Sequence, residues 1–371
     1  MMRSYQVRLK ATKRQGLALG ALLAECCELY NAALQERRDA WKICQKNVTL
    51  YDQMKELAQL RVDPESASFP STIQRDPLRR VDRAFHAFFR RVRARQTPGY
   101  PRFKSRDRYH SFTVDAESFR VEGDRIVVTK MGGFRFHTRC RLKGTPRALH
   151  VKRCGQKWRA VIVCDIGPAP ERVAVSKAVG IDVGVRTLVT LSNGGEVLNP
   201  RWTQEAEERL ARANRQLATK RRGSKNRAKA RERLRRVHEA IVGRRRAWLH
   251  DVSKWLVSNF DLIAFEKLDI RGMVKDAPAS PVRKSILDAA WAELVWMLTY
   301  KAESAGKWAI PVDAGGTTET CSGCGDVVPK KLRKRQHECP KCGLVLGRDH
   351  NAAIEVLQRG LRCAGASAEA A

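Results

Sequence analysis

The stretch Val179-Gly180-Ile181-Asp182-Val183-Gly184 decides the fold expected for the second half of this chain. It predicts an apolar strand over 178–183, and similar patterns predict antiparallel strands over 187–191 and 196–198, with a hairpin turn at 193–195. An unpaired carboxylate is costly to bury in such a strand. Asp182 is therefore a candidate for chemistry, although a lone aspartate in this setting is also compatible with a structural turn residue.

Two other acidic residues stand at comparable positions far along the chain. Glu266 ends the apolar run Leu262-Ile263-Ala264-Phe265, which predicts a buried strand over 261–266. Asp349 lies in Arg348-Asp349-His350-Asn351-Ala352-Ala353, at the start of a predicted helix. Each acid alone is compatible with a salt bridge or a turn. Together, a strand aspartate, a strand-end glutamate and a helix-start aspartate are typical of RNase H-like nucleases, whose carboxylates converge on two Mg²⁺ ions.

Four of the 11 cysteines form two closely spaced pairs. Cys321-Ser-Gly-Cys324 and Cys339-Pro-Lys-Cys342 are separated by 14 residues, which is the spacing of a zinc ribbon. A closed site of four cysteines leaves no open coordination position, so we expect one structural Zn²⁺ ion rather than a catalytic one. A dithiol redox pair is the main alternative.

The composition indicates a polyanionic partner. The 371-residue chain carries 72 Lys and Arg against 39 Asp and Glu, a formal net charge of +33, and such a field repels itself in a compact protein. Nucleic acid is the leading candidate for that partner. No run approaches the roughly 18 continuous apolar residues of a membrane span, and the N-terminus lacks the apolar region of a signal peptide. We therefore expect a cytoplasmic protein without a membrane partner.

The remaining patterns divide the chain at Gly167-Pro168-Ala169-Pro170, which predicts a linker. Before it we expect a strand over 3–10, helices over 14–62 and 73–95, and strands that are clearest over 125–129, 148–153 and 158–165. After it we expect helices over 203–258, from 281 to about 305, and over about 351–358, a strand over 308–312, and a disordered tail after Arg359. The first helical block would be an insertion into a β domain.

These motifs, in this order, resemble the TnpB family, the RNA-guided nucleases of bacterial and archaeal insertion sequences. The resemblance covers nearly the whole chain. Besides the three acidic motifs and the cysteine knuckles, it is carried by Tyr30-Asn31-Ala32-Ala33-Leu34 and by Gly99-Tyr100-Pro101-Arg102-Phe103-Lys104-Ser105.

The resemblance implies a multidomain α+β protein. Its parts would be a RuvC-like (RNase H-like) nuclease domain with an inserted four-cysteine zinc ribbon, a β-barrel wedge domain and a helical recognition domain. The implied boundaries are 1–12 and 106–175 for the wedge domain, 13–105 for the recognition domain, 176–317 and 347–360 for the nuclease domain, 318–346 for the zinc ribbon, and 361–371 for the tail.

The resemblance also implies an activity. Asp182, Glu266 and Asp349 would be the catalytic residues and would hold two Mg²⁺ ions, while Cys321, Cys324, Cys339 and Cys342 would hold one Zn²⁺ ion. The partners would be a guide RNA transcribed from a transposon end and double-stranded DNA with a short motif beside the target. One chain would act per RNA, in a bacterial or archaeal cytoplasm close to the nucleoid.

Two arginine-rich regions, 73–95 and 220–236, are candidate phosphate-binding surfaces, although a charge run alone is also compatible with a solvated face. In the second region, ten of seventeen residues are Lys or Arg. By resemblance, Tyr51, Ser71, Arg75 and Thr113 fall near family positions that face the DNA motif. The other candidate contacts are Arg79, Arg83, Arg221, Arg222, Lys225 and Arg227.

Three alternatives share parts of this reasoning. A cleavage-inactive RNA-guided DNA-binding repressor usually lacks at least one carboxylate, and all three are present here. A miniature type V CRISPR effector would have the same protein chemistry and would differ in its genomic neighbourhood. A DNA-strand transposase would carry a two-histidine motif with a downstream tyrosine nucleophile, and the sequence shows none.

Overall fold

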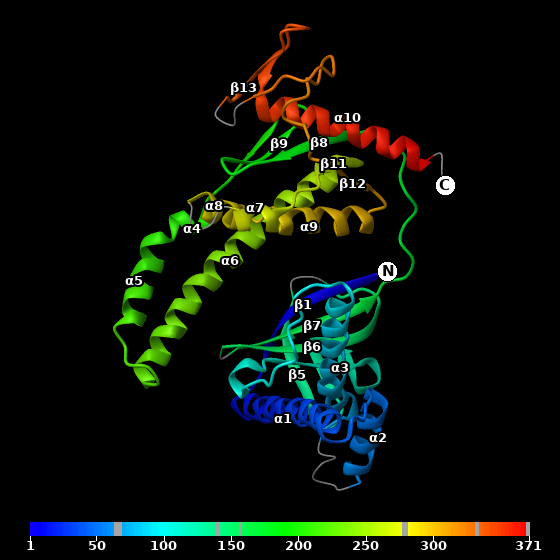
Figure 1. Cartoon of the computed structure of the whole chain (residues 1–371), viewed down its shortest axis with the longest axis vertical. Coiled ribbons are helices and arrows are strands. Elements are labelled where there is room, and N and C mark those ends of the chain that lie inside the picture. Colours follow the sequence, from blue (N-terminus) through cyan, green and yellow to red (C-terminus); the bar gives the residue numbers. More distant parts are fainter. Residues whose placement is uncertain (63–68, 139–140, 156, 277–280, 331–333, 369–371) are drawn as a thin grey trace. The chain divides into compact units, whose positions relative to one another are not determined.

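The computed structural model describes the chain apart from residues 63–68, 139–140, 156, 277–280, 331–333 and 369–371 (Figure 1). The chain divides into two compact units, Met1–Pro168 and Ala169–Ala371. The division falls inside the linker predicted at 167–170. Each unit has its own hydrophobic core.

The first unit is built on a seven-stranded antiparallel sheet in the order β2-β6-β7-β1-β5-β4-β3. Its strands are β1 (Met2–Lys10), β2 (Ser111–Asp115), β3 (Phe119–Glu122), β4 (Arg125–Val128), β5 (Gly132–His137), β6 (Thr145–Cys154) and β7 (Lys157–Asp165). The N-terminal strand β1 lies inside the sheet, where Val7 is opposite Ala160 and Leu9 is opposite Phe136. Among the described residues β2 and β3 do not pair with each other, so hydrogen bonds do not close the predicted barrel.

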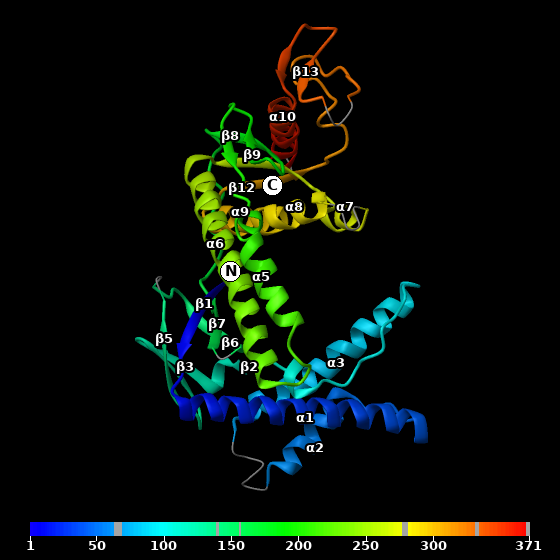
Figure 2. The same cartoon turned by 90° about the vertical axis from the view of Figure 1, so that its left-hand side faces the viewer.

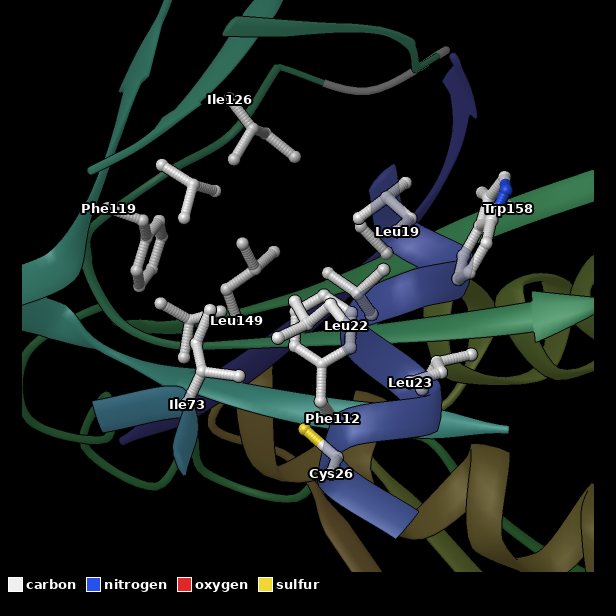
Figure 3. Close-up of a cluster of buried hydrophobic side chains, with 14 of the residues drawn as sticks. Leu19, Leu22, Leu23, Cys26, Ile73, Phe112, Phe119, Ile126, Leu149 and Trp158 are labelled. Atoms are coloured by element: carbon white, nitrogen blue, oxygen red, sulfur yellow. The ribbon is translucent and has the colours of Figure 1, made fainter. Parts of the chain in front are cut away.

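The helical block between β1 and β2 consists of α1 (Lys13–Cys44), α2 (Leu50–Leu60) and α3 (Ser71–Arg93), and the single turns η1 (Arg106–Arg108) and η2 (Ala116–Ser118) lie on either side of β2. This block is the predicted insertion between two strands of one sheet. Residues at helical spacing on α1, including Leu19, Leu22 and Cys26, lie in one core with Phe112 of β2 and Leu149 of β6 (Figure 3). By length and composition α1 could cross a membrane, but its apolar stripe is buried against this sheet.

The single helix predicted over 14–62 was wrong. Gln45 adopts a left-handed backbone conformation, with a φ of 53°, and α1 ends there. Thr49 then begins α2 with a capping box: its hydroxyl accepts the Asp52 N–H at 3.3 Å, and the Asp52 carboxylate accepts the Thr49 N–H at 2.9 Å. Two separate helices result.

The second unit is built on a five-stranded sheet in the order β10-β9-β8-β11-β12. Its strands are β8 (Ala178–Val183), β9 (Thr187–Leu191), β10 (Glu196–Leu198), β11 (Leu262–Glu266) and β12 (Trp308–Val312). Strands β8, β11 and β12 are parallel, whereas β9 and β10 form antiparallel hairpins with their neighbours. These strands match the sequence prediction, and β11 begins one residue later than expected.

Helices cover both faces of this sheet (Figure 1). The helices of this unit are α4 (Trp202–Glu205), α5 (Glu207–Ala218), α6 (Lys225–Asn259), α7 (Ile270–Asp276), α8 (Pro281–Ala289), α9 (Trp291–Ser304) and α10 (Arg348–Ala368). Val179 and Ile181 of β8 share a core with Leu249 of α6 and Leu294 of α9. Because side chains alternate along a strand, Gly180 and Asp182 face the opposite layer, where α10 lies.

Three helix boundaries in this unit differ from those predicted. The helix expected over 203–258 is interrupted between α5 and α6, which lie side by side (Figure 2), because Gly223 has a φ of 83° and Ser224 caps α6. The helix expected from 281 to about 305 is divided at Ala290, whose φ is 53°. The tail expected after Arg359 is helical to Ala368, because Gly360 and Ala364 extend the stripe of α10 that packs on the sheet.

The contact between β8 and α10 leaves no room for a side chain at Gly180. A Cβ there would lie 2.1 Å from the Ala353 carbonyl oxygen and 2.5 Å from the Leu357 nitrogen. We expect Gly180→Ala to lower the free energy of unfolding of the second unit by at least about 3 kcal/mol, because the backbone of α10 must move.

Gly243→Ala in α6 is the matched control, since a Cβ there meets nothing within 4 Å. It should raise stability by about 0.5–1 kcal/mol, because alanine restricts the unfolded chain and favours the helix. Thermal unfolding measures both variants. Equal melting temperatures for Gly180→Ala and the parent would contradict this close packing.

Candidate active site and zinc centre

Two of the three predicted acids meet through strand pairing. In the parallel ladder of β8 and β11, Phe265 lies opposite Ile181, so Glu266 and Asp182 follow side by side at the carboxyl ends of their strands. Phe265 and Ile181 face the core shared with α6 and α9, and alternation turns the two acids toward α10. Ligands commonly bind at the carboxyl ends of parallel strands.

The third acid arrives from the helix that crosses these strands. Asp349 is the second residue of α10, and α10 packs closely on β8 at Gly180 and on β11, where a Cβ on Gly360 would lie 2.4 Å from the Ala264 Cβ. The negative charges of Glu266 and Asp349 both act on Asp182. The structure therefore brings three acids from distant parts of the sequence into one site.

Asp182 is the most perturbed member of this site. Burial, followed by the charges of Glu266 and Asp349, raises its pKa from 3.8 to about 8. Burial also raises the pKa of Glu266, against the opposing effects of a hydrogen bond from Thr317 and the charge of Arg359. The two strand carboxylates thus gain strongly from a nearby cation.

At Asp349, arginine side chains partly supply the positive charge that a cation would bring. The Arg348 guanidinium donates from Nε at 2.9 Å and from Nη2 at 2.7 Å to Asp349 Oδ1, and Arg335 Nη1 lies 3.7 Å from Oδ2. Arg348 is mostly buried. A carboxylate held in this way is oriented as well as neutralised.

The donor set of the three acids fits Mg²⁺. Mg²⁺ prefers carboxylate oxygens, and a cation would relieve the repulsion that raises the pKa of Asp182. The acids are less tightly gathered than the cysteines, which form the one group of potential ligands within 4.8 Å of one another in the described part of the chain.

The four cysteines form a site that can hold zinc. Their sulfur atoms all lie within 4.8 Å of one another, with Cys321–Cys342 and Cys324–Cys339 Sγ separations of 3.6 Å. Tetrahedral Zn–S bonds of about 2.3 Å place sulfurs at about this spacing. Backbone N–H groups, first that of Cys342, lower the pKa of Cys339 from 9.0 to about 7 and so favour the thiolate that zinc requires.

Glycines shape both knuckles of this site. The Gly325 N–H donates to the Cys321 carbonyl at 2.8 Å, and the Gly343 N–H donates to the Cys339 carbonyl at 3.0 Å. Gly325 has a φ of 77° and Gly343 a φ of 72°, a conformation that other residues rarely adopt. The second knuckle is flanked by the short hairpin of β13 (Gln336–Glu338) and β14 (Val345–Gly347).

The candidate nucleic-acid contacts of the first unit lie on α2, α3 and β2, and several are already engaged. Arg79 pairs with Asp115 at 2.8 Å, and Arg83 lies 3.7 Å from the buried Asp76 carboxylate. Asp76 also accepts the backbone N–H of Thr113 at 3.1 Å, and the Thr113 hydroxyl bonds His150 at 3.0 Å. Part of this basic surface therefore stabilises the unit itself.

The other members of this set are placed as follows. Tyr51 is 67% exposed at the start of α2, with the Lys55 ammonium 4.7 Å from its ring centre. Ser71 begins α3, and Arg75 lies one turn further along the same helix. Tyr51 is thus an accessible aromatic side chain among the candidate contacts.

At the α5–α6 hairpin the candidate contacts differ in their surroundings. Arg221, Arg222 and Lys225 are exposed at the tip of the hairpin. Arg227, by contrast, donates to the carbonyls of Leu217 at 3.0 Å and Lys220 at 2.8 Å, so it holds the last turn of α5. The run of basic residues around Arg227 suggested a phosphate contact. Such a run does not reveal that a side chain binds backbone carbonyls.

Sequence reasoning missed the polar residues that hold the site together. Thr317, Arg348 and Arg359 contact the acids or the loop beside them. Arg348 could have been predicted from the sequence, because it directly precedes Asp349 in the same motif. Thr317 and Arg359 could not be predicted from the sequence, because their hydrogen-bond partners lie 51 and 44 residues away.

The pKa of Asp182 predicts a pH dependence of stability without magnesium. Between the ordinary value of 3.8 and about 8, the folded carboxyl binds a proton that the unfolded one has lost. Stability must therefore fall as pH rises through this window, by up to about 1.4 kcal/mol per pH unit from this group. Asp182→Asn should make that fall shallower, as measured by melting temperatures in magnesium-free buffer, and an unchanged slope would contradict the shift.

The cysteine geometry predicts that zinc stabilises the fold. Cys321→Ser should lose the bound zinc and lower the melting temperature, because zinc binding supplies folding energy to small ribbons. Zinc content by elemental analysis and thermal unfolding measure the two effects. Cys44→Ser, at an exposed cysteine outside the cluster, should change neither. Full stability of Cys321→Ser without zinc would contradict a structural role.

The chain is similar to known protein families and to a solved structure. The model of the OrfB_IS605 family, described as a probable transposase, matches residues 161–277, and that of the Cas12f1-like TNB domain matches residues 291–356. The chain is similar to the structure of Cas12f1 in a complex with sgRNA and target DNA. The TM-score is 0.59 at 15% identity, over 93% of this chain and 83% of that one, which shows a shared fold.

Two relatives are similar in sequence over nearly the whole chain. A protein of Streptomyces pristinaespiralis named as an RNA-guided DNA endonuclease is 32% identical over 97% of this chain and 89% of its own length. The RNA-guided DNA endonuclease InsQ of Escherichia coli K12 is 26% identical over 97% of this chain and 92% of its own length. Identity at this level over nearly complete chains shows that this chain belongs to the TnpB-like family of RNA-guided DNA endonucleases.

Proposed function

We propose that this protein binds a guide RNA derived from a transposon end and cleaves motif-flanked double-stranded DNA by two-metal-ion hydrolysis in a single site. One observation carries the proposal: Asp182, Glu266 and Asp349 converge at the carboxyl ends of β8 and β11 and the first turn of α10. The names of relatives that match over nearly their whole length support the guide and the DNA target.

The proposed domains follow the chain. Residues 176–317 and 347–360 form a RuvC-like nuclease domain, and the order β10-β9-β8-β11-β12, with β9 antiparallel to β8, supports that assignment. Residues 318–346 form its zinc ribbon. Residues 1–12 and 106–175 form the wedge domain, with residues 13–105 as the recognition domain inserted into it. The central position of β1 among later strands supports this insertion.

The three acids have distinct tasks in this proposal. Asp182 and Glu266 lie on paired strands and give the site a rigid edge, while Asp349 closes it from α10. Two Mg²⁺ ions in such a site supply activation of the attacking water and stabilisation of the leaving oxygen. The chain's part is to orient its carboxylates, and Arg348 holds Asp349 in place by a hydrogen bond.

Charge supports nucleic acid as the partner. The net charge of +33 favours binding to RNA and DNA phosphates, and guide pairing rather than protein contacts would select the sequence. Arg221, Arg222 and Lys225 at the hairpin tip are the contacts we favour in the second unit. We propose one protein chain per RNA, acting in the cytoplasm beside the bacterial or archaeal nucleoid.

The intact site argues against a cleavage-inactive DNA-binding repressor, because such a protein has no need to gather three carboxylates. A miniature type V CRISPR effector would use the same residues and differ in the source of its RNA. Sequencing the RNA that co-purifies with the protein separates these cases. A defined transcript with a variable 3′ end indicates a transposon-end guide, and a repeat-derived RNA indicates a CRISPR guide.

Cleavage tests the function directly. The purified protein–RNA complex, given Mg²⁺ and a plasmid library with randomised sequence beside the target, should cut a subset that shares a short motif. Asp182→Ala should reduce cleavage at least about a thousandfold, since metal ligands contribute several kcal/mol to the transition state.

The controls separate binding from chemistry. Asp182→Ala should still bind RNA and target DNA, since it removes a negative charge away from the basic surfaces. Target binding by the parent complex without nicking at any Mg²⁺ concentration would favour the repressor. Equal cutting by Asp182→Ala and the parent would remove the assigned site.

A further inference from the structure

Glu266 is held from the side of the zinc ribbon by a residue outside the three acids. The Thr317 hydroxyl contacts Glu266 Oε1 and also lies 3.1 Å from the Ala314 carbonyl oxygen. A hydroxyl has one proton to donate, and the carboxylate is the closer and more strongly accepting partner. Thr317 is only 2% exposed, so water does not replace this bond easily.

The loop that carries Thr317 is fixed by α10. Arg359 Nη1 donates to the carbonyls of Asp313 at 3.0 Å and Gly315 at 2.7 Å, while its Nε donates to Glu355 at 2.8 Å. Asp349 begins the same helix. The position of Glu266 is therefore tied to the element that supplies the third acid.

The chain on the other side of Thr317 is fixed as well. Asn351, fully buried and two residues after Asp349, accepts the Ser322 N–H at 3.0 Å and donates to the Thr320 carbonyl at 2.8 Å. Gln358 donates to the Ser322 carbonyl at 2.9 Å. Contacts from α10 thus hold the segment from 313 to 322 near both ends, with Thr317 near its centre.

We propose that Thr317 is a positioning residue for Glu266, whose hydroxyl sets the carboxylate in the orientation that binds the catalytic cation. This inference rests on the proposed function of the three acids. Residues that orient metal ligands typically change metal affinity 10- to 100-fold when they are lost. The helix α10, which holds the loop of Thr317, supplies the rigid base from which this bond is made.

The test is a pair of substitutions, one of which removes the hydroxyl of Thr317 and the other its methyl group. Thr317→Val keeps the shape of threonine and removes the donor, whereas Thr317→Ser keeps the donor. We expect Thr317→Val to raise the Mg²⁺ concentration for half-maximal DNA cleavage about 10- to 100-fold. Thr317→Ser should stay within about threefold of the parent, because its hydroxyl can still donate to Glu266. A purely structural role for the methyl group would instead spare Thr317→Val and damage Thr317→Ser.

A second readout does not depend on cleavage. Mg²⁺ that binds the folded protein raises its melting temperature by an amount that depends on its affinity. The concentration that produces this rise should shift upward for Thr317→Val by the same factor as in cleavage, while zinc content matches the parent. The melting temperature without Mg²⁺ should fall modestly, because a buried hydrogen bond to a carboxylate is lost. If Thr317→Val does not fold, Thr317→Ala removes the same donor and should show the same shift.

Thr318→Val is the matched control in the same loop. Thr318 is half-buried, and the Lys330 ammonium donates to its backbone carbonyl, a bond that the substitution keeps. It should retain the Mg²⁺ dependence of the parent. Parent-like curves for Thr317→Val in both assays, or equal loss in Thr317→Ser, would overturn the inference. Failure of the parent to cleave would challenge the proposed function, yet the melting-temperature shift would still test Thr317.

Discussion

The close approach of α10 to β8 and β11 is the constraint on which the site depends. Gly180 and Gly360 have no side chains, and the nearest atom across the contact would lie 2.1 Å from a Cβ at the first and 2.4 Å from one at the second. This contact sets the depth at which the helix crosses the strands and brings Asp349 to Asp182 and Glu266. Two glycines therefore determine whether three distant acids meet in one site.

Electrostatic repulsion among the three acids makes this site favour a bound cation. Three acids in a partly buried site repel one another, and the raised pKa of Asp182 expresses that repulsion together with its burial. Arg348 and Arg335 offset it at Asp349, while a hydrogen bond from Thr317 and the charge of Arg359 offset it at Glu266. Asp182 sits deepest of the three. A divalent cation at this site would offset the repulsion among the acids.

Much of the fold followed from local patterns, and the failures had local causes. The strands of the second unit were predicted closely because their apolar runs are short and bounded by turn residues. Helix ends were predicted poorly, because a left-handed Gln45, a capping box at Thr49 and a cap at Ser224 each interrupt a continuous apolar pattern. The carbonyl partners of Arg227 could not be predicted either, because a run of basic residues does not show which backbone groups they contact.

The sequence alone determined the residue types of the chemistry: three acids in recognisable motifs, four cysteines at ribbon spacing and a large positive charge. These are local properties, because each depends on neighbours within a few positions. Only the tertiary structure decided which groups hold the acids in place. Thr317 and Glu266 are 51 residues apart, and Arg359 reaches a loop 44 residues away. Such partnerships arise from the packing of one helix across a sheet, which no local pattern encodes.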